Sequence, residues 1–154
     1  MNAADRSSLQ ERLVLSQVDR YRLVFPAPWV AEISRFQRSH ILHLPFYQPP
    51  LLGLMHQNGH VISLVSAAEL LQVRAATSGE SATVIRLSEN AGSLAQVGIV
   101  VDKVTGSTTR AEMPESVLES TDAPPTLGPG ATVILRQEWF SEQIWQPQRW
   151  SAKR

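Results

Sequence analysis

The chain has 154 residues, the length of one ordinary domain, and 43% of them are hydrophobic, as in globular proteins. Its 14 Lys and Arg residues balance 14 Asp and Glu residues, and this zero net charge argues against binding to nucleic acid or to anionic membranes through charge. The absence of cysteine excludes disulfides, thiolate nucleophiles and cysteine-ligated metal centres. No apolar run approaches the roughly 20 residues that span a bilayer, so we expect a cytoplasmic protein without membrane insertion.

The first third of the sequence predicts one short helix or arm and two short strands. Capping-box spacing at residues 8–11 predicts a helix or an ordered arm over residues 8–17. The β-rich run at residues 21–25 predicts a strand. Residues 29–36 fit either a helical face or a strand, and the choice stays open. Residues 41–44 predict a second strand.

The clearest local pattern is the apolar stretch at residues 51–65, which is interrupted by Asn58 and Gly59. Both central positions of a two-residue hairpin turn require a positive φ, and Asn and Gly tolerate that conformation best. The stretch therefore predicts a β-hairpin. The sequence Ala-Ala-Glu-Leu-Leu at residues 67–71 predicts a short helix directly after it.

The second half of the sequence predicts three more strands, at residues 83–87, 96–104 and 131–135. Residues 105–130 are poor in apolar side chains and hold four prolines, so we expect a polar, irregular stretch. One or two helical turns are expected at residues 139–145. Six or seven short strands with brief helices are typical of small barrels or a sandwich and exclude a βαβ fold.

The four histidines do not form a metal site in this prediction. His40 and His43 point to opposite faces if they lie on a strand. In the predicted hairpin His56 pairs with Val61 and His60 pairs with residue 57, so their imidazoles also point to opposite faces. The sequence contains no Gly-x-Ser-x-Gly elbow, no P-loop and no Gly-x-Gly-x-x-Gly. We therefore expect no metal, no cofactor and no enzymatic activity.

Two features each leave two interpretations open. Asp102 follows an apolar run, and it is either a strand-end aspartate satisfied by backbone donors or an interface residue. The aromatic residues near the C-terminus either close the core or form a contact patch, because Trp is enriched in interface hot spots. Of these, Trp145 lies within the predicted helical turns, and we expect Trp150 to be exposed beyond Pro147.

Two segments together resemble the CheW family of chemotaxis coupling proteins. Residues 51–71 are similar to the family's glycine, hydrophobic strand, turn, strand and short helix. The sequence Gly-Ile-Val-Val-Asp-Lys-Val at residues 98–104 resembles the family's Gly-hydrophobic-hydrophobic-Val-Asp-x-Val pattern. Both segments stand in the expected order, and the resemblance covers about residues 20–145.

The resemblance implies a mainly β fold of two small five-stranded SH3-like β-barrels packed together, with short peripheral helices. It divides the chain into an N-terminal arm or short helix at residues 1–19, a two-lobed CheW-like domain at residues 20–145 and a tail at residues 146–154. It implies a non-catalytic scaffold that couples a methyl-accepting chemoreceptor to a CheA-type histidine kinase in chemotaxis, phototaxis or pilus motility. The expected protein contacts, including the C-terminal aromatics, are Leu54, Asn58, His60, Val100, Asp102, Trp145 and Trp150.

The sequence departs from the family pattern at three positions. Asn58 stands where the family has an arginine that is tied to receptor–kinase coupling, Ser63 where it has a proline, and Ser66 where it has an aspartate. One alternative is therefore a repurposed CheW-like adaptor in another complex. A second, from a different class, is a small β-barrel that binds nucleic acid or a small ligand. The 12 arginines are spread along the chain among acidic residues, which weakens the nucleic-acid alternative.

Overall fold

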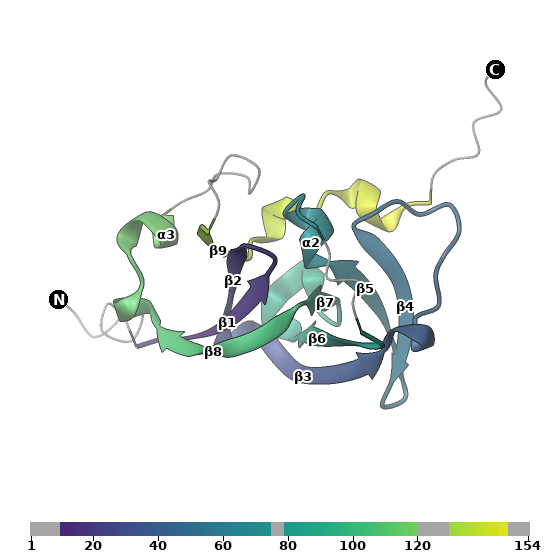
Figure 1. The fold of residues 1–154 in the computed structure, drawn as a ribbon, viewed down its shortest axis with the longest axis horizontal. Coiled ribbons are helices and arrows are strands. Elements are labelled where there is room, and N and C mark those ends of the chain that lie inside the picture. The colour runs from purple at the N-terminus through teal and green to yellow at the C-terminus, as the bar shows by residue number, and fades with distance from the viewer. Residues whose placement is uncertain (1–9, 75–78, 120–129, 148–154) are drawn as a thin grey trace, which may run out of the picture.

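The computed structural model describes residues 10–74, 79–119 and 130–147. In this part of the chain more residues lie in β-strands than in helices (Figure 1). The strands and α-helices are β1 (Arg12–Val18), β2 (Tyr21–Pro26), β3 (Val30–Gln37), β4 (Leu51–Gln57), β5 (His60–Ser66), α2 (Ala67–Leu70), β6 (Ser81–Leu87), β7 (Gly98–Val101), β8 (Lys103–Thr109), α3 (Glu115–Glu119) and β9 (Thr132–Ile134). The 3₁₀ turns are η1 (Ala27–Trp29), η2 (Arg38–His40), η3 (Glu89–Leu94), η4 (Arg110–Glu112), η6 (Gln137–Trp139) and η7 (Glu142–Trp145).

The strands form two mixed sheets. The first has four strands in the order β8-β1-β2-β9, and the second has five in the order β3-β6-β7-β5-β4. Neighbouring strands are antiparallel except for β2–β9 and β5–β7, which are parallel. In Figure 1 the four-stranded sheet lies to the left and the five-stranded sheet to the right. The mainly β prediction with two β units and short helices is confirmed, whereas the closure of each unit as a five-stranded barrel stays a prediction.

Three buried clusters stabilise this arrangement. The largest lies between the sheets and joins Leu23 and Phe25 of β2 to Ile85 and Ile99 of the second sheet. The second cluster occupies the opposite face of the five-stranded sheet, which is therefore buried on both faces. The third packs Leu13, with residues of β2 and β9, against Met113 and side chains of α3. The five-stranded sheet therefore buries apolar side chains on both of its faces, which stabilises the fold.

Two glycines of the family-like segments are required by close packing. A Cβ on Gly98 would lie 2.8 Å from Leu64 Cδ2 and 2.8 Å from Val84 Cγ2, inside the second cluster. A Cβ on Gly53 would lie 2.2 Å from the carbonyl oxygen of Leu42, and the φ of Gly53 is 153°. Each glycine therefore allows an approach that any side chain would block.

Two local predictions are confirmed, the hairpin at residues 51–65 and the short helix that follows it. Asn58 and Gly59 have φ values of 49° and 80°, and Gln57 pairs with His60 across the turn, as the hairpin prediction requires. The helix predicted after the hairpin is α2, and Ser66 caps it by accepting a hydrogen bond from the backbone N–H of Glu69.

Other local predictions are wrong. Residues 12–17, expected to be helix or arm, belong to β1, because pairing with β2 and β8 buries Leu13 and Val18. The strand expected at residues 41–44 is a single bridge between Leu42 and Leu54. The strand expected at residues 96–104 is divided at Asp102, because the chain passes there from the second sheet to the first. Of residues 29–36, left open, Trp29 ends η1 and residues 30–36 form most of β3.

Candidate protein-interaction surface

The tip of the β4–β5 hairpin presents polar and apolar side chains to solvent. Asn58 and His60 are exposed. Leu54 is half-buried on β4, the strand that leads into the turn. Cross-strand pairing places Leu54 opposite Ser63 and His56 opposite Val61, whose side chain is 64% exposed. Paired residues of an antiparallel ladder share one face, so these side chains form a small, partly apolar surface beside the turn. The expected contacts Leu54, Asn58 and His60 therefore lie on one projecting element.

Val100 and Asp102 lie at a different place from the hairpin tip. Val100 is 8% exposed, and its side chain belongs to the second core cluster. Asp102 is half-buried at the point where β7 gives way to β8. Both residues line a small hollow of about 50 Å³ beside Leu52 and Ser66. The structure thus brings these two expected contacts together, but their buried fractions indicate packing as their principal role.

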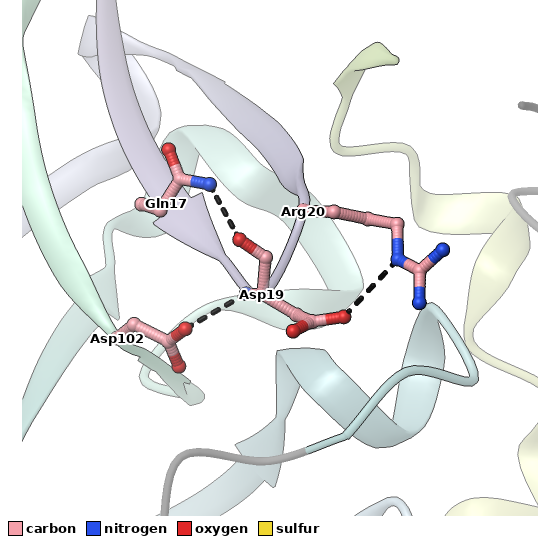
Figure 2. A network of polar contacts seen from close by, with 4 residues as sticks. All are labelled: Gln17, Asp19, Arg20 and Asp102. Atoms are coloured by element: carbon pink, nitrogen blue, oxygen red, sulfur yellow. Dashed lines mark hydrogen bonds and ion pairs between the residues drawn. The ribbon is translucent and has the colours of Figure 1, made fainter. Parts of the chain in front are cut away.

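The Asp102 carboxylate makes a defined structural contact (Figure 2). Asp102 Oδ2 accepts a hydrogen bond from the backbone N–H of Asp19 at 2.7 Å, and the backbone N–H of Asp102 donates to the carbonyl of Gln17 at 3.0 Å. Asp19 has a φ of 53° in the β1–β2 turn, and its carbonyl accepts from the Gln17 side-chain amide. The strand-end interpretation of Asp102, satisfied by a backbone donor, is therefore confirmed.

In this network, hydrogen bonds of Asp102 link the two sheets. Asp102 directly follows β7 of the five-stranded sheet, whereas Gln17 and Asp19 belong to the β1–β2 hairpin of the four-stranded sheet. The remaining member, Arg20, forms an ion pair with Asp19 at 3.5 Å, and its side chain is 61% exposed. Exposed pairs of this kind contribute little stability, so the Asp102 hydrogen bonds are the stabilising part of the network.

The C-terminal aromatic side chains close the core where the structure describes them. Trp139, Phe140, Ile144 and Trp145 pack against the large cluster between the sheets. The rings of Phe140 and Trp145 are stacked, with centroids 6.5 Å apart and an interplanar angle of 3°. Trp145 thus packs against the core and remains half-buried. Trp150 lies outside the described residues.

The sequence did not predict that Arg35, near the end of β3, and His40, in η2, lie close to the β4–β5 hairpin. Arg35 and His40 line a hollow of about 390 Å³ together with His56 and Asn58. The first two residues are distant in sequence from the last two, and no motif links them. They meet because the five-stranded sheet curls. In the described part of the chain no group of three or more His, Cys, Asp or Glu side chains has the geometry of a metal site. No helix within that part is long and apolar enough to cross a membrane.

The family model for the CheW-like domain matches residues 12–134, a range that contains the five-stranded sheet and all of the four-stranded sheet. The chain belongs to the CheW-like family. Among solved structures it is similar to the scaffolding protein TtCheW from Thermoanaerobacter tengcongensis, at 12% identity and a TM-score of 0.53, over 67% of each chain. Comparison with curated proteins gives no match.

The structure accounts for two of the three residues that depart from the expected motif pattern. Ser66 takes the place of an aspartate at the helix N-cap, and serine caps a helix about as well as aspartate does. Asn58 takes the place of the turn arginine and adopts the left-handed φ that this position requires more readily than arginine does. Both residues therefore suit the local geometry of the hairpin and of α2. Nothing in the structure explains Ser63.

Proposed function

We propose that this CheW-like protein is a non-catalytic scaffold that couples a chemoreceptor to a CheA-type histidine kinase. It would act in the cytoplasm, in a chemotaxis, phototaxis or pilus-motility array. The single observation that carries the proposal is the family match over residues 12–134, because that range includes every strand of both sheets. A scaffold of this kind transmits a signal only through the proteins that it contacts, so its function depends on its surfaces.

Two features of the hairpin support it as one contact surface. Asn58 and His60 are exposed at the turn, and Val61 is 64% exposed, more than Ile33, the other exposed large apolar residue on the strands of this sheet. Exposed apolar groups beside polar ones are typical of protein interfaces of moderate size. We assign Leu54, Asn58 and His60 to the hairpin as contacts, with Leu54 on the face of Val61 and His60 on the opposite face. Val100, Asp102 and Trp145 would act by holding the surface in place, and Trp150 is assigned to a second contact.

Co-purification from native cells tests the proposal. The tagged chain should retain a CheA-type histidine kinase and methyl-accepting chemoreceptors, identified by mass spectrometry. The matched variant is Val61→Glu, which places a charge on the proposed surface at an exposed position. We expect this variant to lose at least one of the two partners while keeping its melting temperature. Retention of neither partner by the unmodified chain would contradict the proposal.

A repurposed adaptor is the second candidate, and Asn58 favours it. The family's turn arginine is tied to receptor–kinase coupling, and asparagine supplies neither its charge nor its reach. In that case the hairpin would bind another complex through the same exposed side chains. The same co-purification separates the two candidates, since a repurposed adaptor retains a reproducible partner set that lacks both kinase and chemoreceptor.

A further inference from the structure

The two edge strands of the five-stranded sheet approach one another. β3 and β4 stand at opposite ends of the strand order, so neither forms a ladder with the other. A hydrogen bond of 2.7 Å nevertheless runs from Gln57 Nε2 on β4 to Ser34 Oγ on β3. In Figure 1 the end of β3 lies beside β4, close to η2 and the β4–β5 hairpin. We call this region, from Ser34 to His40 and from Met55 to Asn58, the seam.

The seam contains a hollow whose lining has one permanent positive charge, that of Arg35, and no negative charge. Its volume is about 390 Å³, and its lining comes from β3, η2 and the hairpin. Arg35, His40 and His56 supply its ionisable groups, and none of its lining residues carries a carboxylate. On β3 the nearest acidic residue is Glu32, which is already paired with Arg86 at 3.2 Å. The chain as a whole has zero net charge, so this local bias is a property of the seam.

The seam also contains a short open strand edge, at His56 of β4. The backbone N–H and carbonyl of Leu54 point away from β5, because both pair with Leu42, at 2.9 and 2.8 Å. Backbone groups two residues apart on a strand point to the same side, so those of His56 also face the seam. Among the described residues no strand pairs with β4 at His56 on that side. Unpaired edges of this kind accept an added strand.

We propose that the seam binds an extended acidic segment of a partner protein. The segment would hydrogen-bond to the β4 edge at His56 and place carboxylates against the Arg35 guanidinium and the His40 imidazole. Arg35 Nη2 donates to Ser81 Oγ at 2.7 Å, which holds one end of the guanidinium and leaves its other nitrogens to bind a carboxylate. The proposal rests on the proposed function only in taking the partner to be a protein.

Fluorescence anisotropy with the full chain tests this binding. The probe is a fluorescein-labelled hexapeptide of alternating Glu and Val, which favours an extended backbone, and its counterpart has Lys in place of Glu. We expect the acidic peptide to bind at least tenfold more tightly than the basic peptide at low salt. Its affinity should fall as added salt screens the charges. Hydrogen exchange of the His56 backbone amide should slow when the acidic peptide is bound.

Two variants and one control locate the site. Arg35→Glu should weaken binding of the acidic peptide at least tenfold. Arg35→Gln, which keeps a hydrogen-bond donor, should weaken this binding less. The control is Arg22→Glu, because Arg22 is also an exposed strand arginine but lies on the four-stranded sheet. This control should bind the acidic peptide within about twofold of the unmodified chain. Melting temperatures establish that all three variants are folded.

Several results would overturn the proposal. They are equal binding of the acidic and basic peptides, an equal loss in the Arg22 and Arg35 variants, and unchanged exchange at His56. Tighter binding of a labelled single-stranded oligonucleotide than of the acidic peptide would assign the seam to nucleic acid instead. None of these results bears on co-purification with the kinase and chemoreceptor, so a failure here is distinguishable from a failure of the proposed function.

Discussion

Replacing Asp102 with alanine separates the structural role of this residue from a role in partner contact. The substitution removes the acceptor of the Asp19 backbone N–H, a hydrogen bond of 2.7 Å between the two sheets, and leaves the backbone bond to Gln17 in place. A hydrogen bond to a charged acceptor contributes roughly 1.5–3 kcal/mol when buried. Because Asp102 is half-buried and the Asp19 turn is exposed, water offsets part of this loss. We therefore expect a loss of about 1.5 kcal/mol.

For a domain of this size, about 1.5 kcal/mol corresponds to a fall in Tm of about 3–6 °C, which calorimetry resolves. Asp102→Asn retains an oxygen acceptor and should lie between alanine and the unmodified chain. The control within the same network is Arg20→Ala, whose ion pair with Asp19 is exposed and should change the Tm by less than about 1 °C. An Asp102→Ala protein with unchanged Tm that fails to bind its partners would refute the structural assignment.

Three further substitutions test the packing around the hairpin and its neighbours. Gly98→Ala forces a methyl group to within 2.8 Å of Leu64 Cδ2, and chemical denaturation should show a loss of about 1–3 kcal/mol. Gly53→Ala meets the backbone of Leu42 and an unfavourable φ, so the loss should be about 3 kcal/mol or more, seen as a lower yield of soluble protein. Ser66→Ala removes the cap of α2 and should cost about 1 kcal/mol by the same denaturation assay.

Each of these packing predictions has its own contradicting result. A Gly98→Ala protein as stable as the unmodified chain would mean that the second core cluster relaxes without cost. A Gly53→Ala protein that is less affected than Gly98→Ala would contradict the assignment of the Leu42 bridge as a rigid contact. Replacement of Ser66 by aspartate, which also caps helices, supplies the comparison for Ser66→Ala.

The fold could be predicted from the sequence where one residue type determines a local geometry. Asn58 and Gly59 specify the hairpin because few other residues adopt two successive positive φ values. The apolar run ending at Asp102 predicted a strand, but not that the strand changes sheet there, since alternation does not report which sheet a residue joins. The leucine spacing near the N-terminus matched a helical face, and pairing with β2 and β8 overrode that local preference in β1.

The candidate site was predictable only in part. The hairpin contacts follow from the turn, which projects by its own geometry. The seam could not be predicted, because Arg35, His40 and His56 meet only when the curled sheet brings β3 to β4. Similarly, the carboxylate of Asp102 finds its donor in a turn far away in the sequence, at Asp19. Predicting such contacts requires the path of the chain in addition to its local patterns.

The central claim is that this CheW-like chain binds a kinase and a receptor at the same time. Size-exclusion chromatography with light scattering measures this directly, using the purified chain, the regulatory domain of the CheA-type kinase and the cytoplasmic tip of the chemoreceptor. The account predicts one species whose mass includes all three proteins, and a mixture lacking the chain that contains no such species. Elution of the chain alone, or with only one of the two partners, would contradict its role as a coupling scaffold.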